Sequence, residues 1–120
     1  MQDHRKLKAF VLADELVAEV YRRTRAFPAD EQFGLRSQIR RAAVSAPTNI
    51  VEGCARRTQK ELANFLAIAL GSASEVRYLI EVAQRIEMLP LSDREYLEPR
   101  YDEVVRVLST LLRAVEAEAD

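Results

Sequence analysis

Apolar side chains recur every three or four residues along most of this chain. On a helix of about 3.6 residues per turn, that spacing places them in one stripe along a single face. No segment alternates apolar and polar residues between turn signals, as a half-buried strand would. The pattern therefore predicts an all-α fold made of four helical segments.

The first half of the chain contains two of these segments. The first helix is expected from about residue 5 to 25, and Phe27-Pro28 ends it because a residue before proline avoids helical angles. The second is expected to start near Asp30-Glu31, whose carboxylates favour the positive end of a helix. Pro47 lies inside it, but the apolar stripe keeps its phase on both sides. We therefore predict a kink at Pro47 and not a break.

The second half contains the other two segments. Thr58–Glu61 has the capping-box spacing, so a third helix is expected to start there and to stop at Leu89-Pro90. Ser92–Glu95 repeats the spacing and predicts the start of the fourth helix, which Pro99 is expected to restart after a short first turn. The connections are short, which favours an antiparallel up-down-up-down four-helix bundle. Residues 1–120 are long enough for one domain with a single core.

The third segment has an uncharged stretch from Leu62 to Ser74. A helix without charges on any side is expected to be buried on every side, yet a bundle of four helices leaves each of them an outer face. We therefore predict that a second copy covers this helix and that the protein is a homo-oligomer. The alternative is an ordinary bundle with exposed small residues. At about 100° per residue, the outward positions are Ala67, Gly71, Tyr78 and Val82.

A polar stripe accompanies the apolar one on the second segment. The interpretation is a seam that fixes the register between helices two and three, and a ligand site is the alternative. Counting from a turn near Thr58, Arg41 is expected to form an ion pair with Glu75, and Ser45 to lie level with Gly71 and Ser72. Gly53 and Gly71 are expected where backbones approach closely. The seam residues are Arg41, Ser45, Asn49, Glu52 and Glu75.

Charge is unevenly distributed although the net charge is only −1. Residues 1–60 carry 12 Lys and Arg against 7 Asp and Glu, whereas residues 81–120 carry 5 against 10. The two halves could attract each other in the fold, or the basic half could face phosphate groups. For the second interpretation, the candidate nucleic-acid-binding residues lie on and just after the second helix, with the highest density at 56–60. They are Arg36, Arg40, Arg56, Arg57 and Lys60.

Residues that could support catalysis are scarce. His4 is the only histidine and Cys54 the only cysteine, so neither a catalytic pair nor a metal site is expected, and no cofactor or small-molecule substrate is indicated. A single cysteine suits a reducing compartment, and no uncharged run reaches the length of a membrane span. We therefore expect a cytoplasmic protein that is not an enzyme.

Between Phe27 and Leu89 the chain reads FP, then L-x-x-QIRRAA-x-S-x-P-x-NI-x-EG, and then GS-x-x-E. With these motifs, the block resembles the 23S rRNA intervening-sequence protein family, also called four-helix bundle proteins. The resemblance implies a ring-shaped homo-oligomer, with a pentamer expected, in bacteria and of largely unassigned function. A similar family supplies accessory variability proteins of retroelements, which bind nucleic acid; those are strongly basic, whereas this chain has a pI near 5.9. The matching positions are Phe27, Pro28, Gln38 to Ala43, Ser45, Pro47, Asn49, Ile50, Glu52, Gly53, Gly71, Ser72 and Glu75.

Two functions follow as hypotheses. The first is a homo-oligomeric binding or scaffold protein whose leading partner is RNA or DNA, with the Arg56, Arg57 and Lys60 corner as the leading contact. The second is an adaptor that assembles with another protein and does not bind nucleic acid.

Overall fold

The computed structural model describes residues 2–31 and 33–119, and within them every regular element is helical. Four α-helices span Lys8–Arg23 (α1), Leu35–Cys54 (α2), Gln59–Arg85 (α3) and Leu91–Glu118 (α4). Two short 3₁₀ turns, His4–Lys6 (η1) and Ala29–Glu31 (η2), precede α1 and α2. The predicted all-α class is confirmed.

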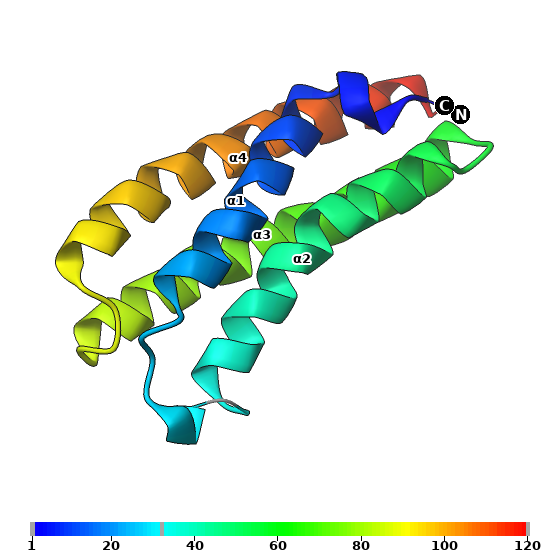
Figure 1. Cartoon of the computed structure of the whole chain (residues 1–120). Coiled ribbons are helices and arrows are strands. Elements are labelled where there is room, and N and C mark those ends of the chain that lie inside the picture. The colour runs from blue at the N-terminus through cyan, green and yellow to red at the C-terminus, as the bar shows by residue number, and fades with distance from the viewer. Residues whose placement is uncertain (1, 32, 120) are drawn as a thin grey trace.

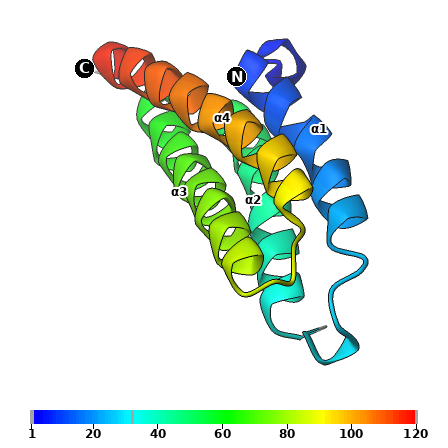
Figure 2. The ribbon, with the colours of Figure 1, turned by 90° about the vertical axis from the view of Figure 1, so that its left-hand side faces the viewer.

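The helices pack side by side into an elongated bundle of 47 × 24 × 20 Å (Figure 1). Helix α3 packs against α2 and α4, and α1 packs on α2 and α4 from the other side (Figure 2). Both chain ends lie near the α2–α3 turn, whereas the α1–α2 and α3–α4 connections lie at the opposite end (Figure 1). Consequently α2 and α4 are diagonal partners, each with an outer face of its own.

The core contains the predicted apolar stripes of all four helices. Burying one Leu or Ile side chain contributes about 1.5–3 kcal/mol, so the stripes are the main source of stability. Tyr101 is fully buried as well, and its hydroxyl has no hydrogen-bond partner among the described residues. The largest fully buried side chains include Val20, Ile39, Ile50, Leu66, Ile80, Leu97 and Leu108.

The ends of the first two helices differ from the sequence prediction. Helix α1 ends at Arg23, before Phe27, and Thr24 is its C-cap. Asp30-Glu31 does not begin α2 but belongs to η2, and α2 starts at Leu35. The carboxylate of Glu31 accepts a hydrogen bond from the backbone N–H of Leu35 at 2.8 Å. Glu31 thus satisfies a free N–H of α2 from outside the helix, as a cap does.

The start of α3 is confirmed and that of α4 is corrected. The hydroxyl of Thr58 accepts from the N–H of Glu61 at 3.1 Å, as the capping box requires. Ser92 caps nothing, because α4 already begins at Leu91 and the carbonyl of Pro90 accepts its first hydrogen bonds. Pro99 does not restart the helix either. It lies at an exposed position inside one continuous α4, where water can solvate the carbonyl that loses its N–H partner.

The two predicted packing glycines behave differently. A Cβ on Gly53 would lie 2.9 Å from Cβ of Phe65 and 3.0 Å from Cδ1 of Leu62, so α2 and α3 approach closely there, as predicted. A Cβ on Gly71 would meet nothing within 4 Å. Within one protomer, the prediction for Gly71 is therefore wrong. No helix in the described part of the chain is long and apolar enough to cross a membrane.

Candidate nucleic-acid interface

The outer face of α2 carries a hollow of about 670 Å³. It is lined by α2 residues between Arg36 and Asn49 and by Tyr21 of α1. Three arginines, Arg36, Arg40 and Arg41, line it together. Two of them, Arg36 and Arg40, were predicted as nucleic-acid contacts, and Arg41 had been placed in the polar seam.

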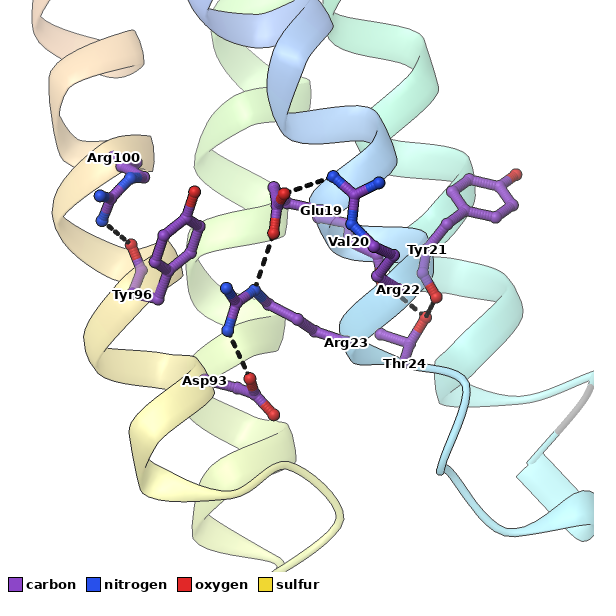
Figure 3. Close-up of polar contacts among 9 residues, drawn as sticks. All are labelled: Glu19, Val20, Tyr21, Arg22, Arg23, Thr24, Asp93, Tyr96 and Arg100. Carbon is purple, nitrogen blue, oxygen red and sulfur yellow. Dashed lines mark hydrogen bonds and ion pairs between the residues drawn. The ribbon is translucent and has the colours of Figure 1, made fainter.

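Arg40 is held in place by the end of α1. Its Nε donates to the hydroxyl of Thr24 at 2.9 Å, its Nη2 donates to the carbonyl of Tyr21 at 3.1 Å, and its guanidinium lies 4.5 Å from the Tyr21 ring centre. Thr24 is fully buried and donates its own hydroxyl proton to the carbonyl of Val20 at 2.7 Å (Figure 3). The guanidinium is therefore preorganised before any ligand arrives.

The predicted ion pair between Arg41 and Glu75 does not form. Arg41 donates instead to the hydroxyl of Ser37, one turn earlier, at 3.0 Å. The carboxylate of Glu75 accepts from Nε2 of Gln38 at 3.3 Å. Arg41 and Glu75 do line one small hollow of about 180 Å³, so the register was right although the pairing was wrong.

The polar seam is shorter than predicted. The hydroxyls of Ser45 and Ser72 lie 2.8 Å apart, which confirms the predicted level of Ser45 on α3. The amide of Asn49 donates to the carbonyl and to the hydroxyl of Ser45, at 2.9 and 3.0 Å. Glu52 is exposed and lies outside this network. The network therefore consists of Ser45, Asn49 and Ser72, all of them partly buried.

The remaining predicted cations lie at the other end of α2. Arg56, Arg57 and Lys60 are exposed in and just after the α2–α3 turn, which we call the corner. The guanidinium of Arg56 lies 4.7 Å from the centre of the Phe65 ring. At about 1.5 Å per residue, the corner is roughly 30 Å from Arg36 along α2. The predicted basic residues thus form two groups at the two ends of one helix.

Helix α2 differs from the other helices in its ion pairs. Five arginines of α1, α3 and α4 pair with carboxylates, as in Arg23 with Asp93 at 2.6 Å and Arg77 with Asp102 at 2.9 Å. Among the described residues, Arg85, Arg100 and Arg113 of α3 and α4 do not. Among the described residues, none of the six cations of α2 and the corner forms an ion pair within 4 Å. Their charge is therefore available to an external anion. The six are Arg36, Arg40, Arg41, Arg56, Arg57 and Lys60.

The α1–α4 side shows the opposite arrangement (Figure 3). Glu19 accepts from Arg22 and from Arg23, and the guanidinium of Arg23 lies 3.8 Å from the centre of the Tyr96 ring. The hydrogen bond from Arg22 lowers the pKa of Glu19, burial opposes this effect, and the bond from Arg23 adds to it. The ring of Tyr96 also has Arg100 at 3.6 Å. Arg23 thus joins α1 to α4, through Asp93 and Tyr96.

The predicted interface residues of α3 face outward. Ala67, Gly71 and Tyr78 are exposed, Tyr78 by 57%, and Val82 is half-buried. Ile68 is 51% exposed beside them, which the sequence analysis did not single out. Ile68 directly follows Ala67, so its place beside the predicted outward face was the signal in the sequence. That a second copy covers this face stays a prediction.

The two residues considered for chemistry lie apart from any such cluster. Cys54 is buried, and burial, followed by the charge of Asp3, raises the pKa of its thiol. The ring of His4 packs edge-on against Phe10 with the ring centres 4.7 Å apart. In the part of the chain that the structure describes, no three His, Cys, Asp or Glu side chains gather as metal ligands would.

The fold and this surface define an all-helical bundle protein whose second helix presents three arginines without an ion pair among the described residues. The chain belongs to the 23S rRNA-intervening sequence protein family, whose pattern matches residues 5–110. Among curated proteins, none matches this sequence. A crystal structure of a protein with unknown function, from the S23 ribosomal protein family of Bacteroides thetaiotaomicron VPI-5482, has the same fold. Its TM-score is 0.80 at 22% identity, over 88% of this chain and 95% of that chain. Neither description names a catalytic activity.

Proposed function

We propose that this protein is a non-enzymatic homo-oligomer that binds nucleic acid through the cations of α2 and the corner. The observation that carries the proposal is the absence of ion pairs for these six side chains among the described residues, while five arginines of α1, α3 and α4 do form such pairs. Cations that contact phosphates release counterions from a nucleic acid, which favours binding without reading sequence. The family name, 23S rRNA-intervening sequence protein, is in keeping with such a partner.

Assembly is the second part of the proposal. The protomer is taken as an antiparallel up-down-up-down bundle, kinked at Pro47, that forms a ring of copies with five expected. The outward face of α3 supports this, because Ile68 and Tyr78 are largely exposed and Gly71 leaves open space beside them. Contiguous apolar surface on a water-exposed helix favours association. A ring would repeat the corner and multiply its attraction for phosphates. We place the assembly in the cytoplasm.

The test compares two double variants in a salt series. Arg56→Ala/Arg57→Ala removes two corner cations, and Arg85→Ala/Arg113→Ala removes two exposed arginines that also form no ion pair with any described residue. Binding to a single-stranded RNA and a duplex DNA is measured by fluorescence anisotropy. The slope of log K against log salt should become shallower by about two for each corner that contacts the strand, and the control should keep its slope. Equal effects in both variants would contradict a role of the corner.

The second candidate is an assembly adaptor that binds a protein and no nucleic acid. An apolar groove of about 450 Å³ between the start of α1 and the second half of α4 favours it. Leu7, Ala9, Val107 and Leu111 line this groove, and Lys8 and Arg106 add positive charge to it. Absence of RNA and DNA binding at low salt would support the adaptor and overturn the first candidate.

A further inference from the structure

The hollow between Tyr21 and the first half of α2 has a composition of its own. The corner presents exposed cations on a turn, whereas this solvent-open hollow combines cations, hydroxyls and apolar surface over about 670 Å³. Sites for small molecules commonly occupy about 300–1,000 Å³ and combine apolar walls with a few placed polar groups. The hollow therefore has the size and make-up of a ligand site.

Its charge is entirely positive. The lining includes Arg36, Arg40 and Arg41 and no Asp or Glu. A guanidinium carries five N–H donors, and Arg40 uses two of them for Thr24 and Tyr21. The others have no acceptor among the described residues, and the two bonds fix the plane of the group. A fixed guanidinium with free donors suits the paired oxygens of a phosphate.

Its wall is aromatic and apolar. Tyr21 is 40% exposed and Val44 is 39% exposed. The side chain of Tyr21 extends away from Tyr96, toward α2 (Figure 3). A planar base could pack on such a wall, because stacking on an aromatic ring is favourable for every base. The hydroxyl of Thr48, one helical turn beyond Val44, adds a polar group at the edge.

The groove between α1 and α4 shows that a hollow of this size need not be basic. It measures about 540 Å³, and Glu15, Glu19 and Glu103 lie among its lining residues. Its arginines, Arg22 and Arg100, are already bonded to Glu19 and to the carbonyl of Tyr96. The carboxylates there would repel an anion. Of the two hollows, only the one on α2 therefore favours a phosphate.

We infer that the α2 hollow binds one nucleotide unit, with its phosphate on Arg36, Arg40 and Arg41 and its base against Tyr21 and Val44. A free nucleotide and a nucleotide within a strand present the same chemistry. The strand as the source rests on the proposed function, whereas binding of the free nucleotide does not.

The test uses the full chain with adenosine 5′-monophosphate, adenosine and inorganic phosphate as separate probes in equilibrium dialysis. The monophosphate should bind more tightly than either fragment. Arg40→Gln and Arg36→Gln should each weaken its binding about tenfold, the usual effect of losing a hydrogen bond to a charged group. Arg100→Gln is the matched control, because Arg100 also lies over a tyrosine ring and donates to its carbonyl, but on α4. It should bind as the wild type does.

Circular dichroism shows whether Arg40→Gln still folds. If it does not, the binding measured with Arg36→Gln tests the inference, because the side chain of Arg36 forms no hydrogen bond among the described residues that the substitution could remove. Unchanged binding in the folded variants, or adenosine binding as tightly as the monophosphate, would overturn the inference. Competition by a short single strand would assign the strand as the source, and its failure to compete would assign the free nucleotide. Strand binding without monophosphate binding would overturn this site and leave the proposed function standing.

Discussion

The hydroxyl of Thr24 joins α1 to α2 by accepting a hydrogen bond from Nε of Arg40 at 2.9 Å. Thr24 is fully buried, and it also donates to the carbonyl of Val20. Both functions of its hydroxyl are therefore used. Through this contact, the end of one helix fixes the orientation of a cation on the next.

Thr24→Val should destabilise the protein by about 1–3 kcal/mol. The valine keeps the shape but leaves the N–H of Arg40 without its buried acceptor. Thr48→Val is the matched control, because Thr48 is exposed and bonds only to the carbonyl of Val44 in its own helix. Its effect should stay within about 0.5 kcal/mol. Urea unfolding followed by circular dichroism measures both, and equal losses would remove the role given to Thr24.

Alanine at the two helix glycines should have opposite effects. At Gly53 the new Cβ would meet Phe65 and Leu62, so overpacking of about 1–3 kcal/mol should exceed the gain in helix propensity. At Gly71 the space is open, and the variant protomer should gain up to about 1 kcal/mol. Thermal unfolding of the two variants gives the comparison. A stabilised Gly53→Ala would mean that α2 and α3 do not approach as closely as described.

Stability should fall at acid pH partly because of Glu19. Its pKa is lowered in the folded state, so its contribution is complete above the ordinary value near 4.5 and is lost as the pH falls through the lowered value. Glu19→Gln should cost about 1 kcal/mol or less at neutral pH and should flatten the acid limb of the stability curve. Glu15→Gln is the control, because Glu15 is an exposed neighbour that forms no ion pair within the described part of the chain. If the wild type and Glu19→Gln lost stability identically as the pH fell, Glu19 would not contribute to the acid sensitivity.

Charges on the outward face of α3 should break the assembly. Ala67→Arg or Gly71→Arg places a guanidinium in the proposed contact, where burying it without a partner is costly. Light scattering coupled to gel filtration should then give smaller particles than the wild type. Ala18→Arg, at an exposed alanine of α1, should leave the mass unchanged. A wild type that already runs as a monomer would contradict the assembly.

Local signals in the sequence predicted local structure well. The cap at Thr58 and Glu61 needs only residues three apart, and the level of Ser45 against Ser72 follows from counting away from a turn. The ion pair of Arg41 with Glu75 was wrong because Ser37 offers Arg41 an acceptor one turn away on the same helix. Counting residues from the turn predicted which side chains lie near one another on α2 and α3, but not which hydrogen bonds they form.

Other features depend on packing that periodicity does not encode. Pro99 was expected to interrupt α4, but the buried side chains on both sides, Leu97 and Tyr101, hold the helix continuous. The bond from Arg40 to Thr24 joins residues 16 apart through the angle between α1 and α2. No spacing rule predicts that angle. The hollow that depends on it could therefore be found only in the structure, although two of its three arginines were predicted.

The most direct test of the central claim is the salt dependence of RNA binding by the wild-type protein. If unneutralised cations of α2 and the corner contact phosphates, log K should fall linearly with log salt, with a slope steeper than about −2 and steeper still for a ring that engages several corners. No binding at low salt, or an affinity that does not change with salt, would contradict the account.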